Sequence, residues 1–159
     1  MNTNIKKTVI KITLLLVPAI FSFAADIPDT EDVPFSRIRR IDWNLTEVKK
    51  RAQTVVIDRE KAQKEIYSIR FQDGRVQGRG ANNLFFAPYT EGKNNSLSIQ
   101  RIAGTYMLPL FEMENFTEHE YFRCLERSYR WEFLDWKLKL YTFDENKEET
   151  ILIFIPIYK

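Results

Sequence analysis

The chain has 159 residues, with 24 Lys and Arg, 22 Asp and Glu, one Cys and one His. A single cysteine excludes an intramolecular disulfide, and one histidine with one thiol is too little for an ordinary metal centre, so we expect no metal and no other cofactor. The small positive net charge comes from the first residues, and without it the chain lacks the concentrated basic charge of a nucleic-acid-binding protein.

Residues 1–24 have the pattern of a secretory signal peptide. Three lysines precede an apolar run over residues 12–25, which is shorter than the roughly 20 apolar residues that a membrane-spanning helix needs. Ser22 and Ala24 are the small residues that favour cleavage after Ala24. An uncleaved N-terminal anchor is the alternative.

Export follows from this interpretation. Loss of three lysines leaves 21 basic and 22 acidic residues in the processed chain. No cysteine lies near the cleavage site, so we expect a periplasmic, secreted or otherwise envelope-located protein that is not a lipoprotein. No transmembrane segment is expected after processing.

Residues 25–38 are predicted to form a flexible leader, because prolines and acids interrupt any periodicity there. The domain itself is expected over residues 39–159. Arg37, Arg39 and Arg40 form a basic cluster at the boundary, which either flanks the first strand in solvent or contacts anionic lipid or an acidic partner.

The first half of the domain shows the two-residue periodicity of β-strands. The first strand contains Trp43, which alternation places in the core. Asp73-Gly74 is a strong hairpin signal, because both residues tolerate positive φ. The predicted elements lie at residues 41–46, 55–57, 66–71 and 75–77, with a short helical turn over 59–65.

Residues 78–89 join glycines to a dense apolar stretch and are predicted to form one bulged strand, with Gly80 allowing a close backbone approach. Three consecutive apolar residues at 84–86 cannot all face one side of a sheet. We therefore expect a binding surface here, although packing in the core is the alternative. The candidate residues are Asn82, Phe85, Phe86, Pro88 and Tyr89.

A helix is predicted over about 116–128, after a short strand at 97–102. Thr117 and Glu120 form a capping box at its start, and Cys124 falls on its apolar face as a small buried side chain. Glu118, His119 and Glu120 are the best candidates for a catalytic group, but they have the positions of ordinary helix-start residues. Because no nucleophile–base motif is present, we expect no catalytic residues.

The end of the chain returns to strands, with hairpin turns expected near 134–136 and 144–147 and a buried run at 151–155. The fold class is therefore α+β and mostly β. We expect a single small domain in which a curled antiparallel sheet carries one main helix.

The sequence resembles the META domain, the family of the HslJ-like heat-inducible envelope proteins. The resemblance runs from about Arg39 to Pro156 and lies in six short motifs in the family's order, among them Trp43-Asn44-Leu45, Gly80-Ala81-Asn82 and Thr105-Tyr106-Met107. Many members carry cysteine at the positions of Ala81 and Pro109, and this chain has lost both. The resemblance implies structural roles for Trp43, Gly80 and Thr105 and an association with stress tolerance, envelope integrity or virulence. No general catalytic site is established for the family.

These observations together predict an exported, non-enzymatic envelope accessory protein that acts by binding. Its partner is expected to be an envelope protein that the sequence does not identify. A carrier of a small apolar ligand, held in the mouth of the curled sheet, is the alternative, and a hydrolytic enzyme is a third.

Overall fold

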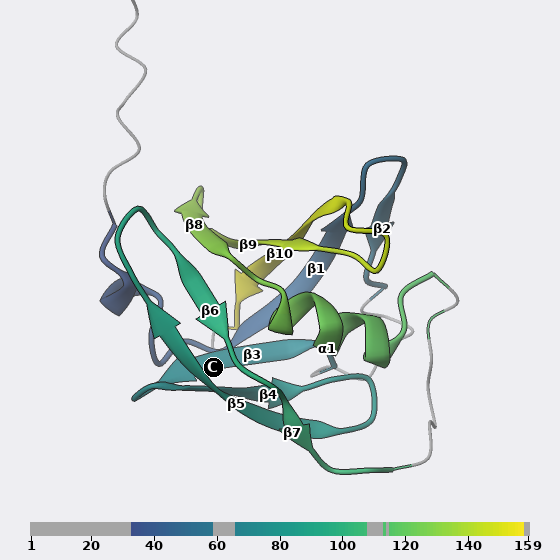
Figure 1. Cartoon of the computed structure of the whole chain (residues 1–159), viewed down its shortest axis with the longest axis horizontal. Helices are drawn as coiled ribbons and strands as arrows, with labels where there is room; N and C mark the ends of the chain where they lie inside the picture. The colour runs from purple at the N-terminus through teal and green to yellow at the C-terminus, as the bar shows by residue number, and fades with distance from the viewer. Residues whose placement is uncertain (1–32, 59–65, 108–112, 114, 158–159) are drawn as a thin grey trace, which may run out of the picture.

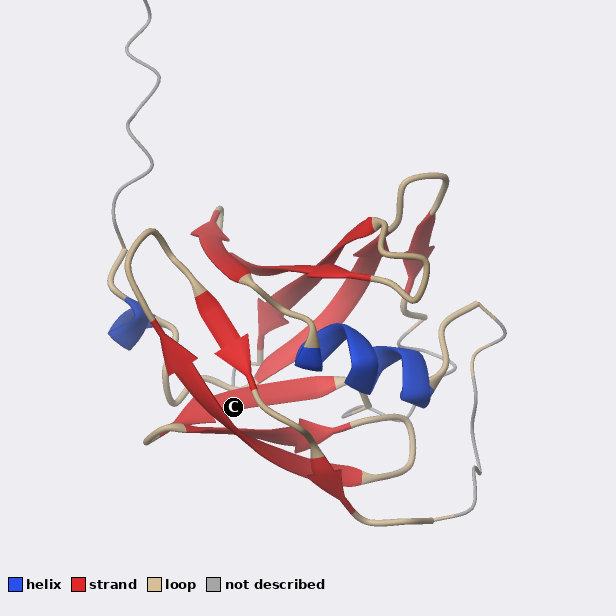
Figure 2. Ribbon diagram, viewed as in Figure 1, coloured by secondary structure: helices blue, strands red, loops and turns tan. Residues whose placement is uncertain are grey.

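The computed structural model of the protein describes residues 33–58, 66–107, 113 and 115–157. Within these residues, antiparallel strands form one strongly curled sheet that carries a single α-helix (Figures 1 and 2). The mostly-β α+β fold expected from the sequence is confirmed. No helix in the described part of the chain is long and apolar enough to cross a membrane.

The elements of the described residues follow one another along the chain. They are η1 (Phe35–Arg37), β1 (Trp43–Lys49), β2 (Thr54–Val56), β3 (Ser68–Gln72), β4 (Arg75–Arg79), β5 (Leu84–Glu91), β6 (Leu97–Ile99), β7 (Ala103–Gly104), α1 (Glu118–Glu126), β8 (Arg130–Leu134), β9 (Lys137–Phe143) and β10 (Glu149–Pro156). The strands lie in the order β6-β5-β4-β3-β1-β10-β9-β8, with β2 paired to β1 and β7 paired to β5.

The central strand β1 bends the sheet. Its register against β10 shifts between Leu45 and Glu47, which places a β-bulge at Thr46. The start of β1 pairs with β3, whereas its end pairs with β2. A bulge bends its strand and increases the local twist, so β1 directs the two halves of the sheet toward each other.

The two ends of the sheet meet between β6 and β8. Ser96 and Arg130 form an isolated bridge there, Leu97 N donates to Tyr129 O at 3.0 Å, and Trp131 N donates to Asn95 O at 2.9 Å. Two backbone hydrogen bonds therefore join these edges, and the sheet is nearly closed.

Helix α1 packs against both halves of the sheet. Phe85 of β5 contacts the rings of Tyr121 and Phe122 at centroid distances of 6.1 and 5.1 Å, and Thr142 of β9 donates to the carbonyl oxygen of Cys124. Thr117 caps the helix, since its Oγ1 accepts from Glu120 N at 3.1 Å. The predicted Thr117 cap and the apolar face of the helix are confirmed.

The structure corrects two sequence-based expectations. The end of the predicted leader is part of the core, because Phe35 and Ile38 are buried and Phe35 packs edge-on against Phe71 and Trp131. The single bulged strand at residues 78–89 is wrong, since Gly80 N donates to Asn83 O at 2.8 Å in a turn that separates β4 from β5. The predicted helical turn at 59–65 and the signal peptide lie outside the described residues.

Candidate functional site

The outer face of the β3–β4–β5 meander carries a shallow groove of about 520 Å³. Strand pairing aligns outward side chains in cross-strand rows, because alternate residues of a strand share one face. Arg70 pairs with Gln77 and Gln77 with Phe86 in one row, and Arg79 pairs with Leu84 in the next. The side chains of Phe86 and Leu84 are 49% and 53% exposed, so apolar surface lies among polar groups.

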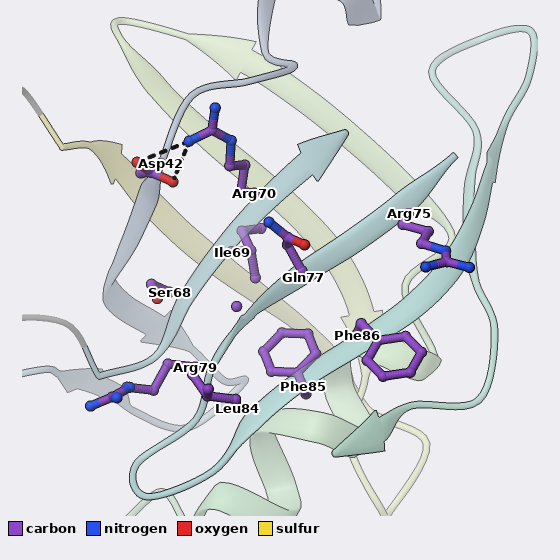
Figure 3. A pocket seen from close by; sticks show the side chains of 11 residues that line it. Asp42, Ser68, Ile69, Arg70, Arg75, Gln77, Arg79, Leu84, Phe85 and Phe86 are labelled. Carbon is purple, nitrogen blue, oxygen red and sulfur yellow. Dashed lines mark hydrogen bonds and ion pairs between the residues drawn. The ribbon is translucent and has the colours of Figure 1, made fainter. Parts of the chain in front are cut away.

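The groove combines this apolar surface with positive charge. Figure 3 shows Arg75 beside Phe86 at one end, where the guanidinium carbon lies 5.8 Å from the ring centroid. The Asp42–Arg70 ion pair lies at the other end, with Arg70 Nη1 3.2 Å from Asp42 Oδ1. The lining residues include three arginines and one aspartate. Arg70 is paired with the aspartate, whereas Arg75 and Arg79 have no acidic partner among the described residues. Such a surface favours a ligand with both acidic and apolar groups.

The residues predicted as a binding surface are divided by the pleat of β5. Phe86 and Pro88 face outward and are exposed, and Asn82 in the preceding turn is partly exposed. Phe85 and Tyr89 point inward and are only 3% and 6% exposed. These two side chains pack in the core with α1 and with Phe71, which was the alternative expectation, although Phe85 also lines the groove. The expectation that the consecutive apolar residues face both sides is correct.

The turn between β4 and β5 is held by Glu118, the first residue of α1. Its Oε1 accepts from Asn82 N and Asn83 N, both at 2.8 Å, and its Oε2 accepts from Asn83 Nδ2 at 2.7 Å. A Cβ atom at Gly80 would lie 2.3 Å from Glu118 Oε1. Gly80 is therefore required for the carboxylate to approach the turn, and its predicted structural role has a specific cause.

We call the contacts of Glu118 with Asn82 and Asn83 the Glu118 clamp. Asn83 also connects this clamp to the segment around β7. Its Oδ1 accepts from Thr105 Oγ1 at 3.0 Å and from Met107 N at 2.7 Å, and Thr105 Oγ1 accepts from Leu84 N at 3.1 Å. The central and Thr105-Tyr106-Met107 motifs thus meet in space. Sequence reasoning missed Asn83 altogether and considered Glu118 only as a helix-start acid, since no local pattern predicts that these two residues meet across the fold.

The possible catalytic residues at the helix start do not converge. Glu118 faces the turn before β5, while Glu120 forms an ion pair with Lys50 at 2.7 Å instead of completing the capping box. His119 is exposed, and its Nε2 lies 4.0 Å from Glu145 Oε1. Among the described residues, no three His, Cys, Asp or Glu side chains are close enough to hold a metal ion.

A polar cluster on β8 and β9 contains Glu132, a carboxylate whose pKa is lowered. Glu132 accepts from Lys139 Nζ and Tyr141 Oη, each at 2.7 Å. Burial alone would raise the pKa of Glu132, but these two hydrogen bonds and the charges of Lys139 and Arg130 outweigh it and hold the pKa below its usual value. This cluster lies away from the groove and joins two neighbouring strands.

Cys124 is an inert core residue. Its side chain is 1% exposed, and burial, reinforced by the charge of Glu120, raises the pKa of the thiol to about 12. The nucleophilic thiolate is therefore scarce at neutral pH. The predicted role of Cys124 as a small apolar side chain agrees with this environment.

Comparison with known proteins identifies a family and its fold. The sequence model of the META domain matches residues 36–154. A protein from Burkholderia xenovorans, solved by NMR, is similar in structure with a TM-score of 0.60 and 16% identity, covering 83% of this chain and 97% of that one. A DUF4847 family protein from Bacteroides vulgatus has a TM-score of 0.51 and 16% identity, covering 76% and 94%. No curated protein matches the sequence significantly.

Proposed function

Because this chain belongs to the META domain family, we propose that it is an exported, non-enzymatic protein of the cell envelope that acts by binding. Export is supported by the three lysines and the apolar run of residues 1–24. The division of Glu118, His119 and Glu120 among separate contacts favours a binding role over catalysis. Stress tolerance or envelope integrity is the physiological setting that the family suggests.

The groove on β3–β4–β5 is the observation that carries the binding proposal. An exposed phenylalanine beside two arginines without acidic partners in the described chain is a composition typical of recognition surfaces. The excess of arginine over aspartate selects a negatively charged partner. We therefore propose an envelope protein that presents an acidic segment containing an apolar anchor, which packs against Phe86 while its carboxylates meet Arg75 and Arg79.

A comparative pull-down from envelope extract tests this proposal. Phe86→Ser removes an exposed ring and should leave the melting temperature close to that of the wild type while abolishing partner capture. Phe143→Ser is the matched control, because Phe143 is also a partly exposed strand aromatic, at 39%, and lies outside the groove. Arg75→Glu should also abolish capture, by charge reversal.

The outcome that contradicts the proposal is equal capture by all four proteins. Phe85→Ser serves as a further control and should unfold, because its ring is buried against α1. The export part is tested separately by mass spectrometry of envelope-located protein. We expect Ala25 as its first residue, and an intact Met1 terminus would refute cleavage.

A further inference from the structure

A second hollow lies at the end of the sheet where the β8–β9 turn approaches the start of β1 and the end of β10. Its volume is about 430 Å³, within the range of roughly 300–1,000 Å³ that small-molecule sites occupy. The Asp42–Arg70 ion pair lines both this hollow and the groove on β3–β4–β5, and so it stands between them. The remaining residues of the two sites differ.

Three aromatic rings form one wall of this hollow, from the core to the surface. Trp43 is buried, Phe133 is partly buried and Trp136 is 69% exposed. The ring centroids of Trp43 and Phe133 lie 6.0 Å apart and those of Phe133 and Trp136 lie 6.1 Å apart, both in edge-on geometry. Ile41 and Ile157 also line the hollow, so an apolar ligand would contact carbon surface over most of its length.

Trp136 is held on the rim in an unfavourable conformation. Asp135 and Trp136 form the turn between β8 and β9, with φ values of 52° and 59°. A two-residue turn with positive φ at both positions favours Asn-Gly, and a bulky residue in the left-handed region is a genuine outlier. Strained backbone positions cluster at functional sites, so the exposed ring of Trp136 at such a position indicates a binding role.

The lining of the hollow also carries positive charge, from Arg37, Arg40 and Arg70. Arg37 has no acidic partner among the described residues, and Arg40 is 3.6 Å from Asp73 in an exposed pair of the kind that binds weakly. Arg70 is already paired with Asp42. Two guanidinium groups thus have donors to offer to an anion next to an apolar wall.

We propose that this hollow binds a small anionic amphiphile, that is, an apolar chain with a carboxylate or phosphate head. The apolar part packs along Trp43, Phe133 and Trp136, and the head is bound by Arg37 and Arg40. The function proposed above rests on Arg75, Arg79 and Phe86, none of which lines this hollow, so the two proposals are tested independently.

Isothermal titration of the purified chain with decanoate, at concentrations where decanoate is monomeric, tests the proposal. Wild type should bind decanoate, whereas decanol, which has the same chain without the charge, should bind about tenfold more weakly because the charge-assisted hydrogen bonds are lost. Trp136→Gly should retain the fold, since glycine accepts positive φ, and should lose binding. Arg37→Gln should weaken decanoate binding but leave decanol binding unchanged.

Arg51→Gln is the matched control for loss of a positive charge, because Arg51 is exposed and does not line the hollow. It should bind decanoate like the wild type. Equal affinity for decanoate and decanol, or wild-type affinity in Trp136→Gly, would overturn the proposal. A parallel experiment with phosphatidylglycerol vesicles separates a free amphiphile from a membrane surface. Capture by vesicles without binding of monomeric decanoate would also overturn it.

Discussion

Replacing Glu118 by alanine should destabilise the domain far more than replacing Glu120, although both acids lie in the first turn of α1. The Glu118 carboxylate accepts three hydrogen bonds at 2.7–2.8 Å from Asn82 and Asn83. Glu120 makes one ion pair, with Lys50. The difference between the two positions is therefore the number of polar groups that lose their partner.

The magnitude follows from these contacts. A hydrogen bond to a charged group contributes roughly 1.5–3 kcal/mol, but water can reach the partly exposed Asn82 and replace part of that. Glu118→Ala should lower the free energy of unfolding by about 3 kcal/mol, most of it from Asn83, which is only 6% exposed. Glu120→Ala should cost under about 1 kcal/mol, as expected for a single ion pair near the surface.

Urea denaturation of both variants measures the difference, provided that their m-values match that of the wild type. Glu118→Gln should be nearly as damaging as the alanine variant, because one side of the amide would present a donor to the donors of the turn. Hydrogen exchange should show faster opening at Asn82, Leu84 and Met107, which the clamp holds together. If Glu120→Ala proved the more destabilising change, the clamp would not have the role assigned to it.

The remaining predictions concern the core, the helix cap, the thiol and the acid range. Trp43→Ala should cost on the order of 3–5 kcal/mol and Thr117→Ala about 1 kcal/mol, and denaturant titrations that reverse this order would contradict the packing of β1. Cys124 should resist thiol reagents at pH 8 in the native protein and react fully in urea, because burial raises its pKa to about 12; rapid labelling of folded protein would show that the site opens. Since the folded-state pKa of Glu132 is depressed, its bonds stabilise the fold above the unfolded-state pKa near 4.5 and are lost as the pH falls through the lower folded value. The melting temperature of Glu132→Gln should accordingly fall less on acidification than that of the wild type, and parallel curves would refute this assignment.

Local patterns in the sequence determined most of the strands and their turns. Alternation places Leu138, Leu140 and Thr142 in the core, where all three are fully buried. The Asp73-Gly74 turn has the positive φ values that its residues favour. These features depend on neighbours within a few residues, so periodicity and turn chemistry are sufficient to predict them.

Some features lay beyond local pattern because they join distant segments. Glu118 holds a turn 35 residues away through Asn83, and the two ends of the curled sheet meet between β6 and β8. The prolines and acids of residues 25–38 predicted a flexible leader, but Phe35 at its end packs on Phe71 of β3. Such contacts depend on the register and curvature of the whole sheet, which a short window of sequence does not specify.

The candidate sites divide in the same way. The run at 84–86 by itself required that apolar side chains face both sides of a strand, so an outward aromatic was expected from the sequence. Only the pairing of β5 with β4 decided that Phe86 faces outward and Phe85 inward. The hollow beside Trp136 was invisible in the sequence, because its walls come from the start of β1, the turn after β8 and the end of β10. Period and turn chemistry act along the chain, whereas a concave surface exists only once distant strands are brought together.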